Sequence, residues 1–240
     1  YGIQMINGQM YYLDEISGSL VTGEKNIGGH WYYFDVADGH RVIGWATLPD
    51  GRRVYYTQDG QIYGQQTING GVYYFDELSG GLVTGEKNVN GNWYYFSPET
   101  GLRVHGWAKL PDQRLVYYSQ EQGQLHGQQT IDGKIYYLDD VSGDIVTGEK
   151  NIDGKWFYFD EKDGHRVSGW VTLPDGRKVY YTDSGMLYGT NIVDDRLYQF
   201  NPISGNCEGD LNAKGLVTVQ GKVYYFKDDG YLYRGELNIG

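Results

Sequence analysis

The sequence predicts an all-β fold, a repetitive solenoid of about eleven β-hairpin units of roughly 20 residues, grouped in superrepeats of about 62 residues. Two observations predict this class: aromatic strands recur at a fixed spacing, and a tight-turn signal precedes each strand. Gly-Glu-Lys-Asn followed by four aromatic residues begins at Gly23, Gly85 and Gly148, at offsets of 62 and 63 residues. Such regularity is typical of stacked modules and not of one globular core.

Each superrepeat contains three kinds of unit, which we name C, A and B in chain order. C units read Gly-x-Gln, a turn and Tyr-Tyr; A units carry Gly-Glu-Lys-Asn; B units open with Gly-Trp and end in Val-Tyr-Tyr. The C units begin at Gly2, Gly64 and Gly127, and the B units at Gly44, Gly106 and Gly169. We expect one domain over 1–240, with regular units over 2–188 and degenerate units over 189–240.

Every unit is predicted to be a β-hairpin, because a pair of turn residues that tolerates positive φ precedes its aromatic strand. These pairs are Asn7-Gly8, Gly28-Gly29, Asp50-Gly51, Asn69-Gly70, Asn90-Gly91, Asp132-Gly133, Asp153-Gly154, Asp175-Gly176 and Gln220-Gly221. A second glycine then turns the chain toward the next hairpin, at Gly18, Gly39, Gly60, Gly80, Gly101, Gly123, Gly143, Gly164, Gly185 and Gly230. Nothing between these marks has the spacing of an amphipathic helix, so we expect almost no helix.

A lone hairpin is marginally stable in water, so the units must bury aromatic faces on their neighbours. Side chains alternate along a strand, which places Trp31 and Tyr33 on one face and Tyr32 and Phe34 on the other. We expect one face to pack along the stack and the other to lie near solvent or a neighbour's groove.

Composition restricts the partners. The chain has 240 residues with 37 Gly, 25 Tyr and 6 Trp, so turns are frequent and aromatic side chains supply the buried surface. The net charge of −11 comes from dispersed acids and disfavours nucleic acid and anionic lipid. No apolar run reaches the length of a membrane span, so we expect no membrane insertion. The single Cys207 excludes an intramolecular disulfide, and the start within a repeat suggests a fragment of a longer protein.

The Gly-Trp openings, Asn/Asp-Gly turns and Trp-Tyr-Tyr-Phe strands together resemble the cell-wall-binding repeat superfamily. This superfamily includes choline-binding modules of surface proteins and phage lysins and the glucan-binding repeats of glucansucrases. The resemblance implies hairpins stacked with about three per turn, and a ligand held at the surface of a Gram-positive bacterium or by its phage. With a three-unit period, like units would then form columns.

In the choline branch, the resemblance implies a cage made from the Gly-Trp tryptophan, the Trp-Tyr-Tyr tryptophan and an aromatic residue of the next hairpin. A units here have Gly-Glu in place of Gly-Trp, and the second tryptophan of the B units is replaced by Val54, Val116 and Val179. We therefore expect the choline cage to be broken.

In the glucan branch, the resemblance implies a site made from a C-unit Gln, a stacking Tyr and a polar side chain of the following A unit. It transfers to three sets, which are Gln4 with Tyr11 or Tyr12 and Lys25, Gln66 with Tyr73 or Tyr74 and Lys87, and Gln129 with Tyr136 or Tyr137 and Lys150. Asn191 takes the Gln position in the tail and no lysine follows, so no fourth site is expected.

The tryptophans are further ligand-binding candidates, and each could instead belong to the packed interior. They are Trp31, Trp93 and Trp156 of the A units and Trp45, Trp107 and Trp170 of the B units. A pyranose has an apolar C–H face that a ring can cover and hydroxyls that bond to amides.

Catalysis and metal binding have little support. Asp35, Asp76, Asp139 and Asp160 recur at turns, where an Asp side chain caps its own backbone. No histidine has the partners of a zinc site, and calcium-loop ligand spacing is absent. We therefore expect no enzyme activity, no cofactor and no metal.

The sequence hypothesis is a non-catalytic module of a secreted or surface protein that binds a carbohydrate polymer, with α-glucan or dextran first. Choline on teichoic acid is an alternative, since a cation can lie over aromatic faces. A structural spacer or dimerisation stalk is a second alternative, and the oligomeric state is left open.

Overall fold

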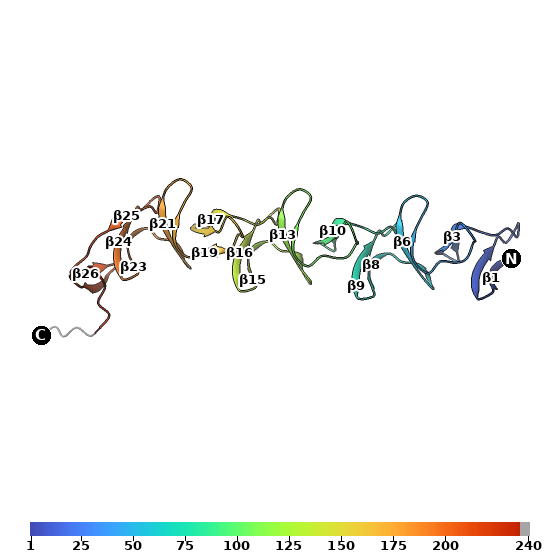
Figure 1. Ribbon diagram of the computed structural model, residues 1–240, viewed down its shortest axis with the longest axis horizontal. Helices are drawn as coiled ribbons and strands as arrows, with labels where there is room; N and C mark the ends of the chain where they lie inside the picture. The colour runs from blue at the N-terminus through green and yellow to red at the C-terminus, as the bar shows by residue number, and fades with distance from the viewer. Residues whose placement is uncertain (236–240) are drawn as a thin grey trace. The chain divides into compact units, whose positions relative to one another are not determined.

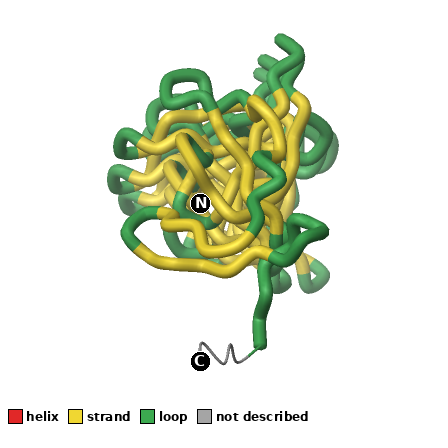
Figure 2. The backbone as a smooth tube through the Cα atoms, turned by 90° about the vertical axis from the view of Figure 1, so that its left-hand side faces the viewer, coloured by secondary structure: helices red, strands yellow, loops and turns green. Residues whose placement is uncertain are grey.

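The computed structural model describes residues 1–235, and in these residues every regular element is a β-strand (Figure 2). No helix there has the length and apolar character needed to cross a bilayer. The strands pair only with sequence neighbours and form eleven small antiparallel sheets, six of two strands and five of three. The predicted all-β hairpin repeat is confirmed.

The strand bounds follow the three unit types (Figure 1). C units contain β1 (Gly2–Ile6) and β2 (Gln9–Leu13), β8 (Gly64–Ile68) and β9 (Gly71–Phe75), and β15 (Gly127–Ile131) and β16 (Lys134–Leu138). A units contain β3 (Gly23–Ile27) and β4 (His30–Phe34), β10 (Gly85–Val89) and β11 (Asn92–Phe96), and β17 (Gly148–Ile152), β18 (Lys155–Phe159) and β19 (Arg166–Val167). B units contain β5 (Gly44–Thr47), β6 (Arg53–Thr57) and β7 (Gly60–Gln61), β12 (Gly106–Lys109), β13 (Leu115–Ser119) and β14 (Gly123–Gln124), and β20 (Gly169–Thr172), β21 (Lys178–Thr182) and β22 (Gly185–Met186). The tail contains β23 (Gly189–Val193), β24 (Arg196–Phe200), β25 (Cys207–Asp210), β26 (Gly215–Val219) and β27 (Lys222–Phe226).

The chain forms two compact units. The first, Tyr1–Leu125, contains the hairpins of two superrepeats; the second, His126–Gly240, contains the third superrepeat and the tail.

Most of the predicted hairpin turns have the expected backbone. Asn69 and Gly70, for example, have φ of 50° and 82°, as a two-residue turn between twisted strands requires. The tail forms the same turn without glycine, because Asp194 and Asp195 adopt φ of 49° and 64°. Carboxylate and amide side chains tolerate this left-handed conformation better than other L-residues do.

The predicted turns at Asp50-Gly51 and Asp175-Gly176 are wrong in kind. In these B units five residues separate the strands, and the Leu48 N–H donates to the Arg52 carbonyl at 2.9 Å. Neither Asp50 nor Asp175 has a positive φ. The proline within Leu-Pro-Asp fixes φ near −65°, which favours the wider loop.

The second glycine of each B unit is required by close packing against the A unit. A Cβ on Gly123 would lie 2.2 Å from the carbonyl oxygen of Trp93, and one on Gly60 would lie 2.7 Å from that of Trp31. The short strands β7 and β14 therefore lie directly against the A-unit strands β4 and β11. Glycine at this position permits the close approach of these backbones.

Both faces of the A-unit hairpin pack against neighbours, which is one of the two arrangements expected for the second face. Phe34 lies against Tyr12 of the preceding C unit, with ring centroids 6.0 Å apart. Tyr33 stacks on Tyr56 of the following B unit at 5.9 Å and an interplanar angle of 16°. Of the alternating aromatic residues in β4, Trp31 alone is exposed, at 43%.

Candidate functional site

The predicted Gln, Tyr-Tyr and Lys sets do not form one site. Strand pairing places Gln66 directly opposite Tyr73, so these two side chains lie on one face of the C hairpin. Tyr74 points to the other face, where Lys87 of the next unit lies over its ring at 5.1 Å. The register is the same in the other two sets, with Gln4 opposite Tyr11 and Gln129 opposite Tyr136.

The glutamine amides donate to backbone carbonyls just before their own hairpins. Nε2 of Gln66 donates to the Tyr63 carbonyl at 2.7 Å, and Gln4 and Gln129 make the same bond three residues back, at 2.9 and 2.6 Å. Asn191 repeats it in the tail at 2.8 Å. The recurring glutamine therefore closes the turn into the C hairpin.

The lysines are part of the contact between C and A units. Lys25, Lys87 and Lys150 lie 5.7, 5.1 and 4.9 Å from the ring centroids of Tyr12, Tyr74 and Tyr137, three rings that are at most 8% exposed.

Each of these tyrosine hydroxyls donates to a nearby carboxylate, and the acceptors are Glu15, Glu77 and Asp140. The bond to Asp140 is the main reason that the pKa of Tyr137 is raised to about 12. These rings are sealed, and the first tyrosine of each pair lies on the opposite face.

The glutamate that replaces the Gly-Trp tryptophan in A units joins the A unit to the B unit. Glu24 accepts hydrogen bonds from Arg52 at 2.5 Å and from the Tyr56 hydroxyl at 2.9 Å. Burial and this bond raise the pKa of Tyr56, which stays a neutral donor. Arg52 also donates to Asp50 at 2.7 Å, so its charge lies between two carboxylates. Glu86 and Glu149 form equivalent networks in the other superrepeats.

The B-unit tryptophans lie in ring clusters. Trp45 is 5.3 Å from Tyr55, which is opposite it in the hairpin, and 5.1 and 5.7 Å from Tyr73 and Phe75 of the next C unit. The Arg53 guanidinium lies over the Trp45 ring at 4.3 Å.

Trp170 repeats this cluster in the second compact unit. It lies 5.2 Å from Tyr180 and 5.1 Å from Tyr198, with the Lys178 ammonium over its ring at 4.7 Å. Trp107 meets Tyr117 at 5.2 Å, and Leu115 stands in the position of Arg53 and Lys178.

The A-unit tryptophans are different, because their rings are open to solvent. Trp31, Trp93 and Trp156 are 43%, 47% and 39% exposed, and within residues 1–235 no other ring packs on them. Each lies opposite an asparagine on the same face of its hairpin, namely Asn26, Asn88 and Asn151.

The asparagine is held by the hairpin turn. Its Oδ1 accepts the backbone N–H of the second turn glycine, at 3.1 Å in all three copies. Among the described residues its Nδ2 has no partner, so a fixed amide donor lies beside an exposed indole. The sequence analysis named the tryptophans but missed Asn26, Asn88 and Asn151. Because the two-residue turn fixes the strand register, the sequence could have predicted that each asparagine lies opposite a tryptophan.

The turn carboxylates have the predicted structural role in the C units. Oδ1 of Asp76 accepts the N–H groups of Leu78 and Ser79 and the Ser79 hydroxyl. These bonds, the Ser79 N–H foremost, lower the pKa of Asp76. Asp139 makes the same bonds to Val141 and Ser142. Asp35 and Asp160 likewise accept turn N–H groups.

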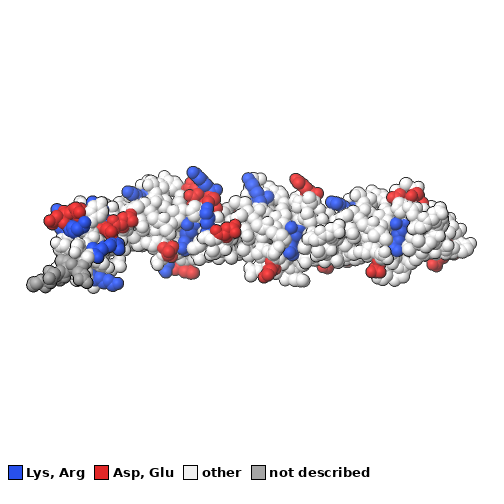
Figure 3. All heavy atoms as spheres, turned by 60° about the horizontal axis from the view of Figure 1, so that its bottom comes forward, with Lys and Arg blue, Asp and Glu red and all other residues white. Residues whose placement is uncertain are grey.

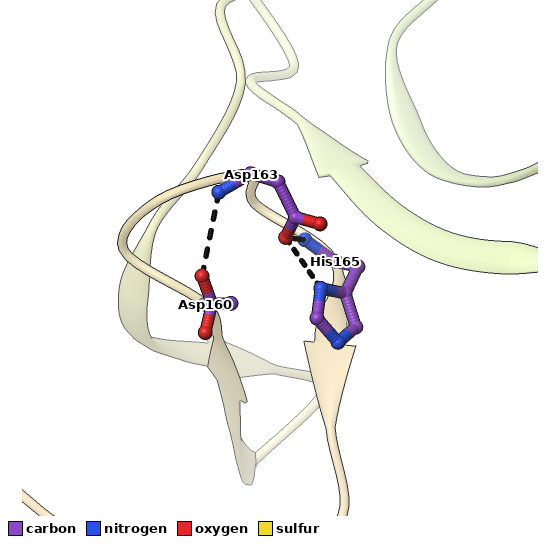
Figure 4. Close-up of side chains that lie close together, drawn as sticks. All are labelled: Asp160, Asp163 and His165. Carbon is purple, nitrogen blue, oxygen red and sulfur yellow. Dashed lines mark hydrogen bonds and ion pairs between the residues drawn. The ribbon is translucent and has the colours of Figure 1, made fainter.

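Within residues 1–235, one cluster has metal-ligand chemistry: Asp160, Asp163 and His165, whose ligand atoms lie within 4.8 Å of one another (Figure 4). Asp163 already pairs with His165 and with Lys134, the latter at 3.0 Å. Asp160 is used by the turn. In the first superrepeat Asp35, Asp38 and His40 take the same positions, and His40 again pairs with Asp38. In the middle superrepeat Ser97 replaces the first carboxylate.

Charge does not gather into a patch on the face that Figure 3 shows. Acidic and basic side chains are scattered there among uncharged surface. Neither a phosphate polymer nor an anionic bilayer has an extended basic surface to contact on this face.

Family comparisons match the repeat units. A profile described as a choline-binding repeat matches residues 146–187, and one described as a putative cell wall binding repeat matches 25–36, 87–99 and 214–232. The chain carries cell-wall-binding repeats. These repeats define a class of binding modules, as the sequence resemblance indicated. No relative was found among curated proteins.

Solved structures share the fold of these repeats. CbpJ from Streptococcus pneumoniae TIGR4 is 24% identical, with a TM-score of 0.66 over 97% of this chain and 93% of that one. Choline binding protein F from S. pneumoniae, solved in the presence of a peptidoglycan analogue, is 24% identical with a TM-score of 0.63, over 97% and 92%. The modular autolysin LytC of the same species is 18% identical with a TM-score of 0.54, over 97% of this chain and 48% of that one.

Proposed function

We propose that this chain is a non-catalytic module that binds a neutral carbohydrate polymer at the surface of a Gram-positive bacterium or its phage. The observation that carries the proposal is the repeated pair of an exposed tryptophan and a turn-fixed asparagine, Trp31 with Asn26, Trp93 with Asn88 and Trp156 with Asn151. An indole covers the C–H face of a pyranose, and the adjacent Nδ2 can donate to a hydroxyl.

The repeat supports a polymer over a single sugar. One indole and one amide make a weak site, whereas several such sites along one chain raise avidity by roughly 10² to 10⁴ without a new contact. An α-glucan is the first ligand to test.

The site differs from the one expected from the glucan-branch resemblance. Gln66 and the sealed Tyr74 with Lys87 serve the packing of the hairpins, so the proposal places the contact surface on the A-unit tryptophans. Trp45 and Trp170 are assigned to the ring clusters between hairpin units, and Trp107 to its ring contact with Tyr117.

Affinity electrophoresis tests the proposal. The chain should be retarded in gels containing dextran and should migrate normally in gels without it. Unchanged migration at every dextran concentration would contradict the α-glucan proposal, and cell-wall polysaccharide gels would then test the wider class.

A second candidate is choline. It is favoured by the choline-binding repeat profile over 146–187, which includes Trp170 and Tyr180 with their ring contact at 5.2 Å. Retention on a tertiary-amine resin and elution by free choline would place it above glucan. Binding to neither ligand would favour a spacer.

A further inference from the structure

The ring clusters around Trp45 and Trp170 each contain a cation of the protein itself. Arg53 lies two residues before Tyr55 in β6, so both side chains are on the face that carries Trp45. Its guanidinium carbon is 4.3 Å from the centroid of the indole, within the range of a cation–π contact. Lys178 has the same place in β21, with its ammonium 4.7 Å from the Trp170 ring.

We propose that Arg53 and Lys178 are specificity-determining residues that close these two aromatic clusters to cationic ligands. A quaternary ammonium group binds over the face of a tryptophan, within about 6 Å of the ring centroid. At Trp45 and Trp170 a tethered side-chain cation occupies that distance. A second cation would clash with this side chain and be repelled by its charge.

The tether gives the side chain an advantage over a free ligand. Arg53 is attached two residues from a ring of the cluster, so its effective concentration at the indole is set by its own short side chain. A free quaternary ammonium ion makes the same kind of contact and must compete with it. Hydrogen bonding does not hold Arg53 elsewhere, because its guanidinium has no hydrogen-bond partner among residues 1–235.

The three superrepeats carry different side chains at this position of the B-unit strand. Arg53, Leu115 and Lys178 precede the same Val-Tyr-Tyr sequence, so the hairpin folds with or without a cation there. The fold therefore does not require a particular side chain at this position, and substitution of Arg53 should leave the fold intact. The residue there can instead determine which class of ligand is admitted.

The experiment is a choline chloride titration of the whole chain, followed by the indole N–H signal of Trp45 in ¹⁵N-labelled protein. Trp45→Phe assigns that signal. In Arg53→Gln the choline Kd reported by Trp45 should fall by about 2- to 30-fold, the range that the energy of one cation–π contact predicts. Lys178→Gln should do the same at Trp170, leaving Trp45 unchanged.

Two controls separate exclusion from general charge. Arg53→Lys keeps a cation over the ring and should keep the wild-type Kd. Lys214→Gln removes one positive charge from an exposed position outside both clusters and should also keep it. A wild-type Kd in Arg53→Gln, or an equal gain in Lys214→Gln, would overturn the proposal. Dextran retardation is measured separately, so neither result depends on the proposed sugar binding.

Discussion

The junction between A and B units and the junction between B and C units use the same residue types in opposite ways. At the first, Tyr33 and Tyr56 stack and are at most 5% exposed, and Glu24 with Arg52 supplies a hydrogen-bonded ion pair. At the second, Trp45 stays partly exposed among rings in edge contact, with Arg53 above it.

One strand contributes to both junctions. Neighbouring residues of β6 point to opposite faces, so Tyr56 enters the sealed junction while Tyr55 enters the partly open one. Arg52 and Arg53 also point to opposite faces. Arg52 forms a salt bridge with Glu24, and Arg53 lies over the Trp45 ring. Alternate positions of this strand therefore serve a sealed ion-pair network and a partly open ring cluster.

The largest effect on stability should come from Gly123→Ala, which tests the approach of B to A units. The new Cβ would lie 2.2 Å from the Trp93 carbonyl oxygen, at a backbone φ of 72°. Overpacking and left-handed strain together should cost about 2–5 kcal/mol in the free energy of unfolding. Gly70→Ala, with φ of 82° and an open surround, is the control for strain alone. Equal losses in chemical denaturation would show that the close approach is unimportant.

Glu24→Gln tests the sealed A-to-B junction directly. The carboxylate accepts from both Arg52 and Tyr56, and an amide cannot accept at both positions. We expect a loss of about 1–3 kcal/mol in urea denaturation. Glu99→Gln, at an exposed turn, should change stability by less than about 0.5 kcal/mol. If Glu24→Gln behaved like that control, the network would not hold the junction.

Acid should weaken the C-unit turns. The pKa of Asp76 is lowered chiefly by the Ser79 N–H, so its carboxylate stabilises the fold above the unfolded pKa and loses this effect as pH falls through the folded one. We expect the melting temperature to decrease once the pH is below about 4. Substituting Asp14, Asp76 and Asp139 with Asn should flatten this dependence, because Asn201 already makes the same backbone bonds. An unchanged slope would assign acid sensitivity to other groups.

The smallest effect should come from Gln66→Ala. Its amide donates to the Tyr63 carbonyl, so we expect a loss of about 0.5–1.5 kcal/mol and no change in dextran retardation. Loss of retardation with unchanged stability would restore the glutamine to the binding site.

The fold could be predicted from the sequence because its signals are local. Turn pairs such as Asn69-Gly70 fix hairpins, and the repeat spacing fixes their order. The B-unit loop was missed, because Asp50-Gly51 resembles a two-residue turn and the preceding proline decides against it.

The candidate site was harder to predict, because it depends on which face each residue takes. Tyr73 and Tyr74 were considered equivalent, but they lie on opposite faces of the hairpin. Gln66 is therefore beside Tyr73, whereas Lys87 lies over Tyr74. Glu24 and Arg52 are 28 residues apart in the sequence. Their hydrogen bond follows only from the packing of two hairpins.

Dextran affinity electrophoresis of Trp31→Ala, Trp93→Ala and Trp156→Ala, made singly and together, shows whether the exposed indoles bind the polymer. Retardation should fall stepwise and be absent in the triple variant. Ile16→Ala, which removes an aliphatic side chain that is 94% exposed, should leave retardation unchanged. A triple variant retarded as strongly as the wild type would show that these tryptophans do not bind dextran.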